Sequence, residues 1–142
     1  MKNSKDILTS VLKTAQMGQI GIRSTLGRSM LPGLRKALES QLKEYDSIET
    51  EAHTLATQHG WELSEVDPAI RVLTDMTVRM KLNGKNTDSK IAGMMIQGNT
   101  RGLINGLKNI HDSIDLDDSI RILSQKLMDC ENANIRKMQT FL

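Results

Sequence analysis

The sequence predicts an all-α protein, an antiparallel four-helix bundle with an extra short helix between the second and third long helices. Apolar residues recur at intervals of three and four along four long segments, as they do on one face of an α-helix. No alternating run rich in Val, Ile and Thr has the length of a strand. The links between most of the long segments are short, which favours antiparallel neighbours.

The first two long helices are expected at residues 5–26 and from about residue 34 to 58. The core face of the first contains Leu8, Leu12, Ala15, Gln19, Ile22 and Leu26. A turn with Pro32 separates the two helices, and Gly60 ends the second. The core face of the second contains Leu38, Leu42, Tyr45, Glu49, Ala52 and Ala56. Gln19 and Glu49 are therefore polar residues at positions expected in the core.

The extra short helix is expected to begin at Asp67 and Pro68, because an N-cap aspartate followed by proline is a typical helix start. Asn83 and Gly84 stop it. Its apolar face is formed by Ala69, Val72, Leu73, Met76 and Met80. This helix could provide a longer crossing connection between the second and third long helices.

The third long helix is expected at about residues 88–112 and the fourth from residue 118, with Asp117 or Asp118 as its cap. The core face of the third contains Ile96, Asn99, Leu103, Leu107 and Ile110. The core face of the fourth contains Ile120, Leu123, Leu127, Cys130, Asn134, Met138 and Phe141. Gly98, Gly102 and Gly106 predict that the third helix approaches a neighbour closely, in this chain or in another subunit, since interior glycines otherwise cost stability.

Size and composition limit the possible functions. The 142 residues fit one helical domain over residues 1–142. A net charge of +2 and only three aromatic residues argue against nucleic-acid binding. A single cysteine excludes an intrachain disulfide and indicates a reducing compartment. Because neither a secretory signal nor a transmembrane segment is recognisable, we expect a cytoplasmic protein.

The polar residues on the expected core faces form one candidate site. They are Gln19, Asp46, Glu49, Asn99, Glu131 and Asn134. Buried polar groups need partners, so these side chains bond to one another, turn in part toward solvent, or hold a cation. Three of them, Asp46, Glu49 and Glu131, are carboxylates and are the candidate metal ligands. An all-oxygen set of this kind suits a single divalent ion such as Ca²⁺, Mg²⁺ or Mn²⁺.

The chain resembles the ferritin-like superfamily, and most closely its uncharacterised bacterial branch. The resemblance is carried by the segments MGQIGIRSTL, PGLRKALESQLKEYDSIETEAHTLATQHG, LTDMTVRMKL and QGNTRGLINGL. Metal-binding members take one Glu from each of two helices and a Glu-x-x-His pair from each of the other two. In this chain Gln19 and Asn99 replace the single glutamates, and Glu49 and Asn134 replace the histidines.

These departures imply a bundle that has lost the di-iron centre, with no resident cofactor or at most one divalent metal. The resemblance and these departures imply a structural or interaction protein rather than an enzyme. We expect it to form a homo-oligomer or to bind a protein partner. The alternative is an iron- or manganese-binding relative with oxidase or storage-type activity. No other catalytic set of residues occurs in the sequence.

Overall fold

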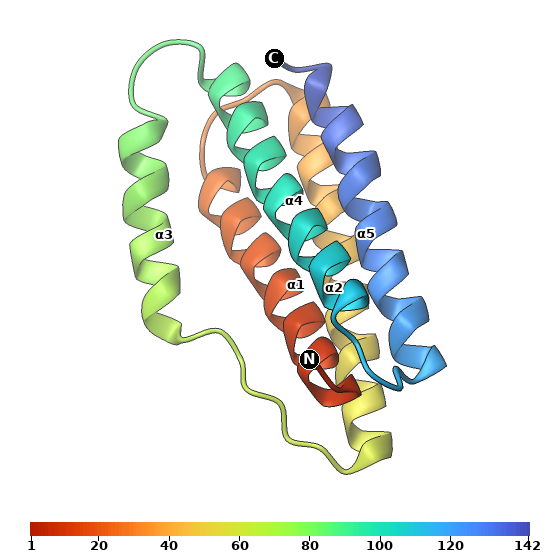
Figure 1. The fold of residues 1–142 in the computed structure, drawn as a ribbon. Helices are drawn as coiled ribbons and strands as arrows, with labels where there is room; N and C mark the ends of the chain where they lie inside the picture. The colour runs from red at the N-terminus through yellow and green to blue at the C-terminus, as the bar shows by residue number, and fades with distance from the viewer.

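The computed structural model describes residues 1–142 and contains five α-helices. They are α1 (Ser4–Leu26), α2 (Pro32–His59), α3 (Pro68–Lys81), α4 (Thr87–His111) and α5 (Asp118–Gln139). The four long helices lie side by side as an antiparallel bundle, and the shorter α3 stands at one side (Figure 1). The all-α class and the extra short helix between the second and third long helices are thus confirmed.

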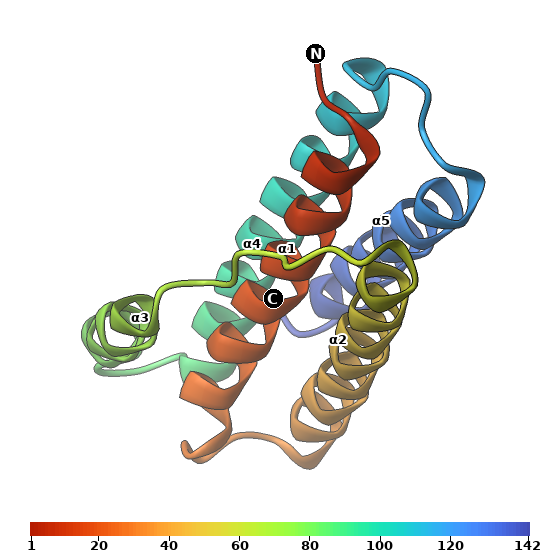
Figure 2. The same cartoon turned by 90° about the horizontal axis from the view of Figure 1, so that it is seen from below.

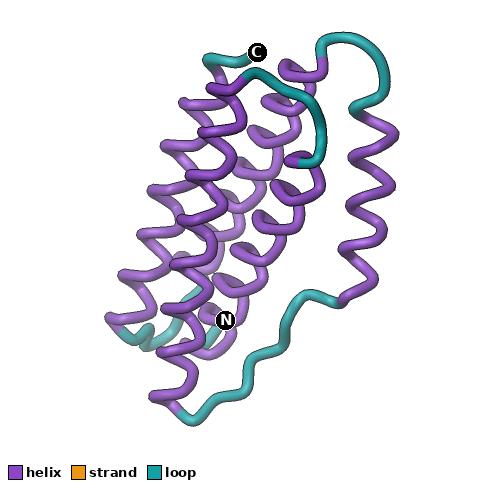
Figure 3. The backbone as a smooth tube through the Cα atoms, turned by 180° about the vertical axis from the view of Figure 1, so that it is seen from behind, coloured by secondary structure: helices purple, strands orange, loops and turns teal.

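Within the bundle, α1 packs mainly against α2, and α4 mainly against α5. The chain reaches α4 through a long crossover made of the 60–67 linker, α3 and the loop that follows it (Figure 3). As a result α2 and α4 run in the same direction and lie diagonally across the bundle (Figure 1). None of the helices is both long enough and apolar enough to cross a membrane.

The helix ends follow local signals in the sequence. The Asn3 side chain accepts a hydrogen bond from the Asp6 N–H, and the Asp6 carboxylate accepts one from the Asn3 N–H, which together form a capping box. Asp67 and Asp117 cap α3 and α5 through their side chains. Gly60 ends α2 with φ 68°, a left-handed conformation that favours glycine.

The core lies between the four long helices and is mainly aliphatic, with a minority of buried polar side chains. Its fully buried members include Leu8, Leu12, Ile22, Leu34, Leu38, Ile48, Ile91, Ile120 and Met138. Tyr45 is the one aromatic residue buried among them. Gln41 and Glu131 are large polar side chains that are also buried.

The apolar face of α3 is mostly exposed to solvent. Val72, Leu73, Met76 and Met80 are 56–79% exposed, and Val78 is the buried residue of this helix. Figure 2 shows the reason: α3 stands apart from the four-helix layer and packs mainly against α1. A helix with one main neighbour buries only a narrow strip, so most of its apolar face stays in solvent.

The glycines of α4 behave as predicted at two positions of three. A β-carbon at Gly102 would lie 3.0 Å from a Glu131 carboxylate oxygen, and one at Gly106 would lie 2.8 Å from Met128. The lack of a side chain at both positions allows α4 to lie close to α5 of the same chain. Gly98 is different, because a β-carbon there would meet nothing within 4 Å.

Candidate functional site

The buried polar side chains between the long helices form what we call the polar core: Gln19, Gln41, Tyr45, Asn99, Glu131 and Asn134. Tyr45 of α2 joins two of them, Asn99 and Glu131. Its hydroxyl oxygen lies 3.0 and 3.1 Å from the two carboxylate oxygens of Glu131 on α5, and 3.4 Å from Oδ1 of Asn99 on α4. Its ring lies against α1, where a β-carbon at Gly18 would come within 2.4 Å of the ring. The absence of a side chain at Gly18 therefore creates the space that the phenol occupies.

Burial controls the protonation of this pair. Desolvation raises the pKa of Glu131 to about 8, the Tyr45 hydrogen bond acts in the opposite direction, and the charge of Glu44 adds to the rise. Desolvation and the adjacent Glu131 carboxylate also raise the pKa of Tyr45. At pH 7 the phenol is protonated and the Glu131 carboxyl is mostly neutral, so the pair carries little charge in the core.

A second polar group lies between α1 and α2. The Gln19 Nε2 donates to Oδ1 of Asp46 at 2.9 Å and approaches Oε1 of Glu49 at 3.3 Å. Gln16 Nε2 donates to the other Glu49 oxygen at 3.0 Å, and Arg23 lies 3.6 Å from Asp46. Both carboxylates are only half-buried and are paired with side chains of α1.

Gln16 also fastens the linker that precedes α3. Its Oε1 accepts a hydrogen bond from the Val66 N–H at 3.0 Å, and its Nε2 lies 3.3 Å from Glu65. Glu65 is in turn 3.4 Å from Nε2 of His53. The second polar group therefore connects the crossover to the bundle.

The structure divides five of the six predicted residues between two hydrogen-bonded groups, and Asn134 makes no hydrogen bond in either. Gln19, Asn99, Asn134 and Glu131 are buried, whereas Asp46 and Glu49 are half-buried, because Ile48 takes the core position expected for Glu49. Glu131 bonds to Tyr45, and the other two carboxylates bond to α1. No group of three or more His, Cys, Asp or Glu side chains is arranged to hold a metal ion.

Gln41 and the hydroxyl of Tyr45 are buried polar groups that the sequence did not predict. Gln41 is buried with neither side-chain nitrogen nor oxygen bonded, and the amide nitrogens of Asn99 and Asn134 are also without partners. The periodicity of the sequence places Tyr45 on an apolar core face and predicts no role for its hydroxyl. Its hydroxyl was the available signal, since a buried tyrosine usually places that group on a hydrogen-bond partner.

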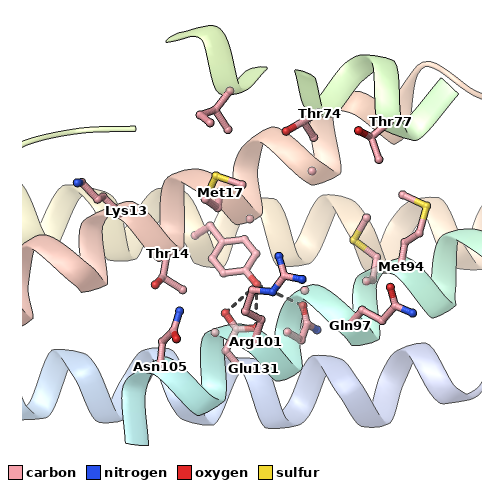
Figure 4. A pocket seen from close by; sticks show the side chains of 18 of the residues that line it. Lys13, Thr14, Met17, Thr74, Thr77, Met94, Gln97, Arg101, Asn105 and Glu131 are labelled. Carbon is pink, nitrogen blue, oxygen red and sulfur yellow. Dashed lines mark hydrogen bonds between the residues drawn. The ribbon is translucent and has the colours of Figure 1, made fainter. Parts of the chain in front are cut away.

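A cavity of about 740 Å³ opens beside the Tyr45–Glu131 pair, between α1, α3 and α4 (Figure 4). Tyr45, Asn99 and Glu131 belong to its lining. The wall contributed by the helices contains apolar residues, including Met17, Leu73 and Met94, and cationic residues, including Lys13, Lys81 and Arg101. The volume is within the range of small-molecule sites.

Comparisons with known proteins give one structural match. No family model matches the sequence, and no curated protein matches it. The fold is similar to the crystal structure of a DUF305 fragment from Deinococcus radiodurans, with a TM-score of 0.77 and 12% sequence identity. The match covers 96% of this chain and 93% of that one. At this identity the match shows a common helical fold and does not show membership of the ferritin-like superfamily.

Proposed function

We propose that the protein is a ferritin-like bundle without a di-iron centre, which acts by interaction rather than by catalysis. The observation that carries this proposal is the bond between Tyr45 and Glu131. The single O–H of the phenol lies 3.0 and 3.1 Å from the two oxygens of Glu131, the most deeply buried acidic side chain. A buried carboxyl group that is mostly protonated at pH 7 and hydrogen-bonded to a phenol is poorly suited to bridge two cations.

The donor set as a whole does not fit a dinuclear iron site. Such a site needs several carboxylates and imidazoles around one point in the bundle core. In this chain the carboxylates are divided between two groups, and amides stand at four of the ligand positions or next to them: Gln16, Gln19, Asn99 and Asn134. Carboxamides are neutral and weak ligands for hard cations.

The topology supports the ferritin-like part of the proposal. Bundles of this class have one long crossover connection, in contrast to bundles joined entirely by short loops. The crossover here joins α2 to α4 and contains α3. The superfamily assignment thus rests on the resemblance of the sequence together with this connection.

The exposed face of α3 supports an interaction role. Val72, Met76 and Met80 are each more than half exposed on one short helix. An exposed apolar face of this kind marks contact with another molecule more often than it serves the isolated chain. Self-association or a protein partner is the role we assign to it.

Metal analysis of protein purified without chelator tests the proposal. We expect substoichiometric iron and manganese in the wild type, in Glu131→Ala and in Glu49→Ala. Glu39→Ala, which removes an exposed carboxylate from the same helix as Glu49, is the matched control. Stoichiometric metal in the wild type and in the control, lost in Glu131→Ala or Glu49→Ala, would overturn the proposal in favour of a metal-dependent oxidase or storage protein.

The same measurement covers the intermediate case of one divalent cation. Asp46 and Glu49 share the Gln19 amide as a donor, so their carboxylates lie close together at the surface of the bundle. One Ca²⁺, Mg²⁺ or Mn²⁺ per chain, lost in Glu49→Ala but kept in Glu131→Ala, would place a mononuclear site there. That result would contradict our proposal that the protein has no resident metal.

A further inference from the structure

Two glycines of the cavity lining are not explained by packing. Gly21 of α1 and Gly98 of α4 both line the cavity, and a β-carbon at either would meet nothing within 4 Å. An interior helical glycine is roughly 1 kcal/mol less favourable than alanine. Gly18 and Gly102, which line the same cavity, are accounted for by Tyr45 and Glu131. The lack of side chains at Gly21 and Gly98 keeps the cavity wide, although each glycine lowers the stability of its helix.

An unpaired donor lies in the same lining. Asn99 is only 3% exposed, and its Nδ2 has no hydrogen-bond partner, although its Oδ1 lies 3.4 Å from the Tyr45 hydroxyl. A buried donor without a partner costs about 1–3 kcal/mol. An oxygen atom of a molecule bound in the cavity would remove that penalty. Asn99 therefore points to a ligand that carries hydrogen-bond acceptors.

The cations of the lining are unpaired as well. Lys13, Lys81 and Arg101 make no hydrogen bond to a side chain and have no carboxylate within 4 Å. The two acidic residues of the lining are already engaged, Asp6 in the α1 cap and Glu131 with Tyr45. The free positive charge of the cavity would attract an anion, and a guanidinium matches the geometry of a carboxylate or phosphate.

The rest of the lining contains both apolar side chains and uncharged polar ones such as Thr14, Thr77 and Gln97. In Figure 4, Lys13 and Asn105 lie toward one end, Met94 and Thr77 toward the other, and Met17 and Arg101 between them. Ile70, Leu73 and Val78 of α3 add to the apolar wall. Methionine side chains adapt to irregular apolar shapes, so a flexible hydrocarbon body fits this lining.

We propose that the cavity between α1, α3 and α4 binds a small amphipathic organic anion, with its acidic head near Lys13 and Arg101 and its apolar body along Met17, Leu73 and Met94. The occupant is a single free molecule of the fatty-acid type and not a bilayer. This inference goes beyond the proposed function, since it assigns a small-molecule site that needs no metal. The two proposals are tested by separate measurements.

Calorimetric titration with decanoate, below its micellar concentration, tests the site. We expect saturable binding of one molecule per chain, and weaker binding of the uncharged decanol. Gly98→Leu fills the open space and should weaken decanoate binding by about tenfold or more, as expected when a pocket of this kind is blocked. Gly93→Leu is the matched control, because Gly93 lies on the same helix, has open space around it and is not part of the lining.

A charge variant tests the proposal even if Gly98→Leu does not fold. Arg101→Gln should weaken decanoate by roughly fivefold or more and leave decanol unchanged, because only the anion is attracted by the guanidinium. Arg136→Gln, an exposed arginine of α5 outside the lining, should change neither. Circular dichroism melts establish that each variant is folded.

Three results would overturn the proposal. The first is the absence of saturable decanoate binding to the wild type. The second is binding that folded Gly98→Leu and Arg101→Gln leave unchanged, or that the two control variants weaken equally. The third is association with phosphatidylglycerol vesicles without any binding of decanoate, which would assign the apolar lining to a membrane surface.

Discussion

The phenol of Tyr45 and the carboxyl of Glu131 form a buried pair that links α2 to α5, with the hydroxyl 3.0 Å from Oε1 and 3.1 Å from Oε2. No other hydrogen-bond donor reaches Glu131. The pair and the adjoining cavity meet at this point, since both residues belong to the cavity lining. The stability of the bundle and the shape of the cavity therefore depend on the same two side chains.

Tyr45→Phe removes the hydroxyl and keeps the ring in its place against Gly18. Glu131 is left without a donor, and we expect a loss of about 1–3 kcal/mol in the free energy of unfolding. Urea unfolding followed by circular dichroism measures it. The loss should be larger at pH 9 than at pH 6, because the ionised carboxylate needs the hydrogen bond more than the neutral acid does. In a Glu131→Gln background the pH dependence of the loss should disappear, and its persistence would show that the pair is not coupled.

Glu131 should make the protein less stable as the pH rises. Its pKa is about 8 in the folded chain and about 4.5 when unfolded, so between these values the folded state binds more protons than the unfolded one. The free energy of unfolding should fall progressively from about pH 5 to pH 8 by an amount on the order of a few kcal/mol, and level off above. Below pH 4.5 the carboxyl is protonated in both states and contributes no slope.

Glu131→Gln should flatten this dependence and should be neutral or stabilising at pH 8, because the cost of burying a charge is removed. Glu39→Gln, at an exposed position of α2, should leave the slope as in the wild type. Melting temperatures at half-unit pH intervals give the comparison. A wild-type slope that survives in Glu131→Gln would mean that another group controls it.

Cys130 should react slowly. Burial, together with the nearby Glu44 carboxylate, raises the pKa of its thiol to about 12. At pH 8 the thiolate fraction is then so small that alkylation by iodoacetamide should be at least about 100-fold slower than for a free thiol. The rate should rise steadily with pH and reach the ordinary value in urea. Rapid alkylation of the folded protein at pH 8 would contradict this assignment.

The helix positions could be predicted from the sequence because each end has its own local signal. These end signals act within one turn of the chain; they are Gly60, Asp67 before Pro68, and Asp117. The apolar periodicity between the ends predicts the helices themselves. The burial of Gln19 and Asn99 followed from the same periodicity.

The orientation of α2 shows where this reasoning ends. Ile48 and Glu49 are neighbours in the chain, and the apolar spacing around them fits a core face through either one. The structure turns Ile48 inward, so the deeply buried carboxylate is Glu131 and not Glu49. A rotation of one residue depends on packing against other helices, which a single periodicity does not contain.

The cavity and the exposed face of α3 could not be predicted for a related reason. Periodicity shows that a helix has an apolar face but not what covers it. Whether Met76 and Met80 are buried depends on where the crossover places α3, and that is decided in part by Gln16 and its contacts with the linker. Those contacts join residues far apart in the sequence.

Gly18 provides the sharpest test of the packing around Tyr45. In Gly18→Ala the new β-carbon would lie 2.4 Å from the ring and would force the phenol to move. Overpacking of this kind costs about 1–3 kcal/mol, against a gain of up to about 1 kcal/mol from helix propensity. Gly93→Ala, with nothing within 4 Å of the new β-carbon, should show the gain alone.

The displaced ring should also weaken the bond to Glu131, so Gly18→Ala should steepen the fall of stability between pH 6 and pH 9. Urea unfolding of both glycine variants at the two pH values measures these effects together. Tyr45→Leu, with a smaller side chain, should abolish most of the cost of Gly18→Ala in the double variant, because the clash depends on the ring. If Gly18→Ala proved as stabilising as Gly93→Ala, the phenol could not lie against α1, and the position of the hydroxyl beside Glu131 would have to be abandoned with it.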